Sequence, residues 1–145
     1  MAQNDLNQWM LIGRLMAAPE MRFIPSGQPV TSIIQAVNNV YGSGQEKKTT
    51  LTKYRLEVWG KQAEIMNQYA ARGQRIYAEA RPKADQEEGP QKGRPRIWQD
   101  KEGGARADYE GTILSFQLLD KPSGAASGAP APEGQAPASE EEFYF

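Results

Sequence analysis

The sequence contains no cysteine and no histidine among its 145 residues. Without cysteine, the protein cannot form disulfide bonds, thiolate metal sites or a cysteine nucleophile. Without histidine, it lacks the commonest general base and the commonest zinc ligand. We therefore expect a binding protein rather than an enzyme, with no metal and no cofactor.

Long apolar runs are also missing, since no stretch approaches the roughly 18 residues that a membrane-spanning helix needs. The first residues, Met-Ala-Gln-Asn-Asp, lack the basic and apolar regions of a signal peptide. These absences predict a cytoplasmic protein that does not contact a membrane.

Charge of both signs is present, but it is unevenly placed, and the net charge of −1 hides this. Residues 1–120 hold 16 basic and 14 acidic side chains, whereas residues 121–145 hold one lysine and four glutamates. A basic body joined to an acidic end indicates a charged partner for the body and a separate interaction segment.

The composition divides the chain into three parts. Residues 1–120 have the length of one domain. Residues 121–139 read KPSGAASGAPAPEGQAPAS, which has nothing to bury in a core and is expected to be a disordered linker. Residues 140–145 then form a distinct tip of three acids and three aromatics.

The body is predicted to be all-β with one short helix. Apolar or alternating segments indicate strands at 7–16, 29–40, 49–60, 74–81 and 109–119. Residues 61–72 are typical of a helix, because Ala63, Met66, Tyr69 and Ala70 share one face and Gly73 follows. This order fits a five-stranded Greek-key barrel with a helix after the third strand, although periodicity alone also allows another small α+β domain.

Two polar segments interrupt this pattern. Residues 42–50 (GSGQEKKTT) form a polar loop, and residues 94–100 are expected to pair with the segment from Ala105 onward as a projecting hairpin.

The third predicted strand separates its side chains into two faces. Tyr54, Leu56 and Val58 share one face, and the other carries Lys53, Arg55, Glu57 and Trp59. Cations interleaved with aromatic rings suit single-stranded nucleic acid, because bases stack on rings while lysine and arginine follow the phosphates. The alternative is that each aromatic ring packs against its own neighbours.

A second nucleic-acid motif is a basic segment, Lys92-Gly93-Arg94-Pro95-Arg96. It resembles the core of an AT-hook, which lays arginines in an A·T-rich minor groove, although its flanks, Gln91 and Ile97, are not basic. The alternative is a basic loop that follows single-strand phosphates or is only solvated.

Several stretches together resemble the bacterial-type single-stranded DNA-binding proteins. They run in family order over about 115 residues: LIGRL at 11–15, PEMR at 19–22, PSG at 25–27, AVN at 36–38, VWGKQAE at 58–64, residues 69–73, and IWQDK at 97–101. The resemblance implies an oligonucleotide-binding (OB) fold, usually four copies per assembly, and single-stranded DNA wrapped without strong sequence preference.

The resemblance also implies a set of DNA-binding residues. Tyr41, Trp59 and Trp98 match three of the family's base-stacking aromatics, whereas the fourth place falls at Lys53, and neighbouring Tyr54 is expected to point inward. Electrostatic capture of the phosphates is assigned to Arg14, Arg22, Lys53, Arg55, Lys61, Arg94, Arg96 and Lys101. The loop 85–96 is longer than is usual in the family.

The tip resembles the family's acidic end, which has three acids followed by Ile-Pro-Phe. Here the residues are Glu140, Glu141, Glu142, Phe143, Tyr144 and Phe145. The resemblance implies docking on replication and repair proteins, with acids that steer and a terminal aromatic that fills a pocket. It also implies association with the nucleoid.

Two other functions remain open from the residues. A restart-primosome-like adaptor on the same barrel would depend more on protein contacts than on DNA. A nuclease would need a carboxylate cluster, for which Asp85, Glu87 and Glu88 are candidates although they lie in a loop without a fixed frame.

Overall fold

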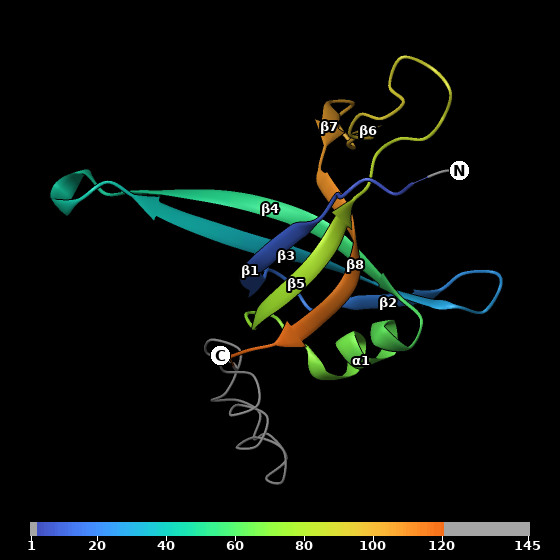
Figure 1. Cartoon of the computed structure of the whole chain (residues 1–145), viewed down its shortest axis with the longest axis horizontal. Coiled ribbons are helices and arrows are strands. Elements are labelled where there is room, and N and C mark those ends of the chain that lie inside the picture. The colour runs from blue at the N-terminus through green and yellow to red at the C-terminus, as the bar shows by residue number, and fades with distance from the viewer. Residues whose placement is uncertain (1–2, 121–145) are drawn as a thin grey trace, which may run out of the picture.

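The computed structural model describes residues 3–120 (Figure 1). The strands are β1 (Trp9–Leu15), β2 (Glu20–Phe23), β3 (Pro29–Tyr41), β4 (Lys48–Trp59), β5 (Arg75–Pro82), β6 (Ile97–Gln99), β7 (Ala105–Ala107) and β8 (Tyr109–Leu118). The helix α1 (Lys61–Tyr69) lies between β4 and β5, and a short 3-10 turn spans Gly44–Glu46. The predicted linker 121–139 and tip 140–145 lie outside the described residues.

Five strands close into a barrel. β1 pairs with β5, β5 with β8, β8 with β4, and β4 with β3, and β3 returns to β1 through the pairs Arg14–Ala36 and Leu15–Gln35. Every pairing is antiparallel except that of β4 with β8. This topology, with its helix between the third and fourth barrel strands, confirms the predicted OB-fold Greek-key barrel.

Closure of the barrel depends on Gly13 in β1. A Cβ atom there would lie 2.2 Å from the carbonyl oxygen of Ala36 on β3, which is too close for any side chain. The two strands that close the barrel therefore approach each other at a position where only glycine fits.

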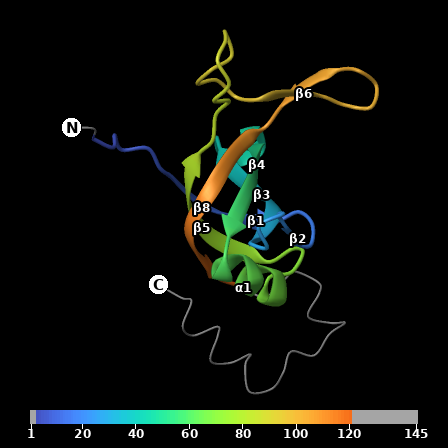
Figure 2. The same cartoon turned by 90° about the vertical axis from the view of Figure 1, so that its right-hand side faces the viewer.

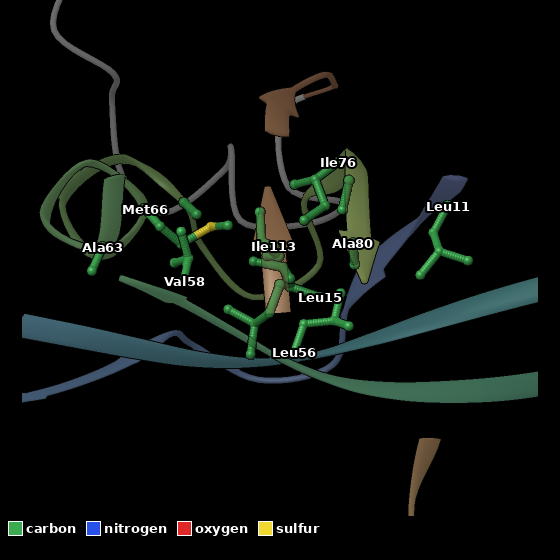
Figure 3. Close-up of a cluster of buried hydrophobic side chains, with 12 residues drawn as sticks. Leu11, Leu15, Leu56, Val58, Ala63, Met66, Ile76, Ala80 and Ile113 are labelled. Carbon is green, nitrogen blue, oxygen red and sulfur yellow. The ribbon is translucent and has the colours of Figure 1, made fainter. Parts of the chain in front are cut away.

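The core fills the barrel and continues onto the helix. Figure 3 shows side chains from α1 and from the strands converging on this interior, including Met66, Val58, Leu56, Ile76 and Ile113, all of which are buried. The hydroxyl of Thr31 donates a 2.7 Å hydrogen bond to the carbonyl of Ala63, which fixes the helix against β3. Burial of this apolar surface is the main force that holds the helix to the barrel.

An aromatic cluster lies where β1 and β8 begin. Trp9 contacts Tyr54 edge-on with ring centroids 5.0 Å apart, and Tyr54 lies 5.6 Å from Tyr109. The inward orientation expected for Tyr54 is confirmed, because this side chain packs against the core. Its ring is thereby turned away from the face that carries Lys53 and Arg55.

The predicted element boundaries differ from the structure in two places. The helix ends at Tyr69 rather than at Arg72, because Ala70 is already extended and Gly73 takes a φ of 85° in the following turn. Tyr69 is consequently exposed and does not join the buried face. The short strand β2 was not predicted, because only four residues, EMRF, separate two polar turns.

Two hairpins project from the barrel. β3 and β4 continue beyond it as a long pair that ends at the polar loop around Gly44 (Figure 1). The predicted hairpin is confirmed as β6 paired with β7, and it extends from the end of the barrel opposite α1 (Figure 2). Within residues 3–120, no helix is long and apolar enough to cross a membrane.

Candidate nucleic-acid interface

The outer surface of β2, β3, β4 and the start of β8 gathers four cations that are far apart in sequence. We call this the cationic face, defined by Arg22, Arg55, Lys83 and Arg96. These side chains line one hollow together with Ser32, Glu57 and Glu110. The strand period of two places Arg55 and Glu57 there, because they point away from the buried side chains of Leu56 and Val58, whereas Lys83 directly follows β5 and Arg96 directly precedes β6. The hollow thus combines four cations with two carboxylates and carries an excess of positive charge.

Three of the four cations of this face, Arg55, Lys83 and Arg96, are already paired with carboxylates, whereas Arg22 donates a 3.4 Å hydrogen bond to the hydroxyl oxygen of Ser32. The Lys83 Nζ lies 2.6 Å from an oxygen of Glu57, and Arg96 donates from two nitrogens to the two oxygens of Glu110 at 3.3 and 3.0 Å. The hydrogen bond with Glu110 raises the pKa of Arg96 above its already high value. Lys83 and Arg96 are about half exposed, whereas Glu57 and Glu110 are mostly buried, so a phosphate can compete with these carboxylates for the exposed side of each cation.

Trp59 lies at one border of the cationic face. It ends β4 and is in register with Val30 of β3, which in turn is in register with Arg22 of β2. Val30 is fully buried between them, and Trp59 is partly exposed. An indole ring supported by an apolar neighbour and beside a cation has the surroundings that a stacking base requires.

Trp98 lies at the other border, on β6 of the projecting hairpin. Its indole nitrogen donates a 3.0 Å hydrogen bond to Asp108, which follows β7. The same carboxylate oxygen lies 3.6 Å from the Nε of Arg55 on β4. The hairpin aromatic and a barrel cation are therefore joined through one side chain.

The turn of this hairpin is organised by Asp100. Its carboxylate accepts hydrogen bonds from the Nε of Arg106 at 2.8 Å and from the backbone N–H groups of Gly104 and Glu102. The bond from Arg106, followed by that from Gly104, lowers the pKa of Asp100 below its ordinary value. The turn is thus held as one unit, which keeps the short β6–β7 pair in register.

Other predicted DNA-binding residues lie outside the cationic face. Tyr41 and Lys48 pair at the far end of the β3–β4 hairpin, roughly 35 Å along β4 from Trp59 at about 3.3 Å per residue. Lys53 is exposed between these two sites. Their roles in DNA binding stay predictions, and together they would mark a path along the hairpin.

Arg14 and Lys61 lie toward the helix end of the barrel. Arg14 donates a 3.0 Å hydrogen bond to the carbonyl of Gly73, and Lys61 begins α1. The structure does not bring either of them to the cationic face, so a contact with the same DNA segment would need the strand to continue around the barrel.

The loop 85–96 is closed on itself. The N–H of Asp85 donates to the carbonyl of Arg94, and its carbonyl accepts from Gly93. Lys92 is paired with Glu88 at 2.6 Å, and Arg96 is paired with Glu110. Because two of its three cations have partners, the segment does not present the extended basic edge of an AT-hook; Arg94 and, in the next turn, Lys101 are exposed.

Three residues of this site were not predicted from the sequence: Lys83, Asp108 and Glu110. Lys83 directly follows β5, Asp108 joins β7 to β8, and Glu110 is the second residue of β8, and each has its partners in other segments of the chain. Only the outward position of Glu110 could have been inferred, because it neighbours buried Gly111 in the last strand and successive side chains of a strand point to opposite faces. In the described residues, no group of three or more acidic side chains is placed to hold a metal ion, Asp85, Glu87 and Glu88 included.

Comparisons with known proteins agree on one family. The model of the family described as "Single-strand binding protein family" matches residues 6–119. Single-stranded DNA-binding protein 1 of Xylella fastidiosa is 30% identical over 145 residues, which cover 97% of both chains. The single-stranded DNA-binding protein of Neisseria meningitidis serogroup A is 28% identical, with coverage of 90% of this chain and 69% of that protein.

Solved structures resemble the fold. A Plasmodium falciparum SSB in complex with ssDNA superposes with a TM-score of 0.62 at 20% identity, covering 83% of this chain and all of that one. Wild-type single-stranded DNA-binding protein from Thermus aquaticus has a TM-score of 0.59 at 25% identity, over 79% of this chain. The match spans half of the Thermus chain.

Proposed function

Because this chain belongs to the single-strand binding protein family, we propose that it coats single-stranded DNA with little preference for sequence. The observation that carries the proposal is the cationic face, which lies between two partly exposed tryptophans, Trp59 and Trp98. A role that consists of binding and protecting the strand needs no catalytic group.

The proposed mechanism is an exchange of anions followed by stacking. Phosphates replace Glu57 and Glu110 beside Lys83 and Arg96, which releases counterions from the DNA. Bases then stack on the tryptophans, at roughly 1–3 kcal/mol for each base. The path would continue over Lys53 to Tyr41 along the β3–β4 hairpin.

Tryptophan fluorescence tests this proposal directly. Poly-dT is titrated into the protein at low and at high salt, and strong quenching that salt reverses is expected. The logarithm of the binding constant should fall with the logarithm of salt by roughly 0.7 per phosphate contact. Absence of quenching, or binding that does not respond to salt, would exclude the mechanism.

We further propose that four copies assemble, as the family resemblance implies. Support comes from a second surface, the outer side of β1 and β5, where Met10 is 69% and Ile12 is 45% exposed. Residues 9–13 of β1 also pair on one edge only among the described strands. An exposed apolar strip beside a free strand edge is a common feature of a surface between subunits.

The tip 140–145 is proposed to recruit proteins of DNA replication, recombination and repair at the nucleoid. Support comes from its sequence alone, in which three acids precede Phe143, Tyr144 and Phe145. Deleting these six residues should leave affinity for DNA unchanged or slightly higher, because the acids compete with phosphate for the basic body. A marked loss of DNA affinity in the same titration would assign the tip to the DNA site instead.

A further inference from the structure

Asp108 occupies the junction between the projecting hairpin and the barrel. It follows β7 and precedes β8, and its side chain is one-third exposed. One carboxylate oxygen accepts the indole N–H of Trp98 at 3.0 Å and faces the Nε of Arg55 at 3.6 Å. After the hydrogen bond and charge of Glu110, the charge of Asp108 also contributes to the raised pKa of Arg96.

These contacts matter because, within residues 3–120, neither strand of the hairpin pairs with a barrel strand. β6 and β7 form their own two-stranded sheet, separate from the six-stranded one. The chain itself joins β7 to β8 through Asp108 alone, and beyond that connection the placement of Trp98 relative to β4 depends on side chains, namely the Asp108 contacts and the Arg96–Glu110 pair. A hydrogen bond to a charged acceptor is stronger and more directional than one to a neutral acceptor.

We propose that Asp108 is a positioning residue for DNA binding, which orients the ring of Trp98 and holds Arg55 in a partly neutralised state. The proposal rests on the proposed function. With its N–H engaged, the indole presents its faces to a base. Because Asp108 lies beside it, Arg55 binds a phosphate only when its ion pair with Asp108 is broken.

Two substitutions of Asp108 distinguish its role as a hydrogen-bond acceptor for Trp98 from its role as a charge beside Arg55. Asp108→Asn retains an oxygen that accepts the indole N–H but removes the charge, whereas Asp108→Ala removes both. The matched control is Asp120→Asn at the other end of the barrel. Arg75 lies 3.7 Å from Asp120, and their side chains are 47% and 33% exposed. The corresponding values for Arg55 and Asp108 are 48% and 33%.

Salt dependence tests the role of the charge. In titrations with oligo-dT, Asp108→Asn should bind more tightly than the unchanged protein at low salt, with a slope steeper by roughly 0.7 because Arg55 becomes available to a phosphate. Asp120→Asn should leave the slope unchanged. Equal slopes for Asp108→Asn and the unchanged protein would overturn this part of the proposal.

A double-substitution cycle tests the orientation of Trp98. Trp98→Phe keeps a stacking ring but has no N–H. At high salt, Asp108→Ala should weaken oligo-dT binding by about three- to tenfold, a part of the roughly 5- to 150-fold that one stacked base contributes. The same substitution in the Trp98→Phe background should cost less than twofold. An equal loss in both backgrounds would show that Asp108 acts through general stability and would overturn the proposal.

The experiment distinguishes the two levels of inference. If the unchanged protein does not bind oligo-dT, the proposed function itself is wrong. If it binds and both Asp108 variants behave like Asp120→Asn, the function stands and the positioning role is wrong.

Discussion

The barrel has two outer surfaces that the same strand alternation builds with opposite chemistry. The cationic face carries four basic side chains, two of which form ion pairs with Glu57 and Glu110. The second surface, which we call the apolar face, consists of Met10 and Ile12 on β1 with Tyr77 and Glu79 on β5 and Ser115 on β8.

The two surfaces differ in the groups that contact their charged side chains. On the apolar face the one carboxylate, Glu79, accepts 2.7 and 2.8 Å hydrogen bonds from the hydroxyls of Tyr77 and Ser115. These bonds, first that of Tyr77, lower the pKa of Glu79, and the same bond raises the pKa of Tyr77. Neutral donors satisfy Glu79, so this face is suited to contact protein, whereas the cationic face is suited to exchange anions.

The largest expected effect comes from placing a charge on the apolar face. If this face is buried between subunits, Ile12→Arg leaves an unpaired charge there, which costs about 3–5 kcal/mol. Light scattering should then give a lower mass than that of the unchanged protein. Ile65→Arg on α1, where the isoleucine is similarly exposed, is the control and should keep the assembly intact. An unchanged mass for Ile12→Arg would place the subunit contact elsewhere.

A smaller loss is expected on the cationic face. Trp59→Ala and Trp98→Ala should each weaken oligo-dT binding by about 1–3 kcal/mol, because each removes one stacking ring. Circular dichroism should show the barrel intact in both variants. Tyr69→Ala, which removes an exposed aromatic ring from α1, should leave affinity unchanged. If neither tryptophan variant binds more weakly, the DNA path does not cross this face.

The smallest expected effect is the loosening of the β6–β7 hairpin in acid. The pKa of Asp100 is lowered by Arg106 and Gly104, so its bonds stabilise the folded hairpin fully above the ordinary aspartate pKa of about 3.9. That contribution is lost as the pH falls through the lower, folded pKa.

The carboxyl chemical shift of Asp100 can be followed by NMR between neutral and strongly acidic pH. The midpoint of its change should lie at a lower pH than in an unstructured peptide. Asp100→Asn should remove this pH dependence from the amide signals of Arg106 and Gly104. A midpoint at the peptide value would show that the turn does not hold the carboxylate.

Much of the fold followed from local patterns. Alternation in β4 correctly separated inward Leu56 and Val58 from outward Arg55, because a strand has a period of two whatever its surroundings. The order of elements then predicted the barrel. The strand β2 was missed because it forms only through its pairing with β3, which no local pattern in four polar-flanked residues records.

The candidate site was predicted only in its residue types. Trp59, Trp98, Arg55 and Arg96 were identified as DNA-binding candidates, but Lys83 was not, because its partner Glu57 is 26 positions away. Arg14 was grouped with these cations, although its strand carries it toward Gly73.

The sequence by itself determined the inward side chains of β4, the order of the five barrel strands and the helix, and that basic and aromatic residues alternate, since these depend on neighbours along the chain. Only the tertiary structure decided which cations share a hollow, which carboxylates form ion pairs with those cations, and that Asp108 contacts both Trp98 and Arg55. The reason is physical: ion pairs and hydrogen bonds depend on distances of a few ångströms, and barrel closure sets those distances between residues remote in sequence.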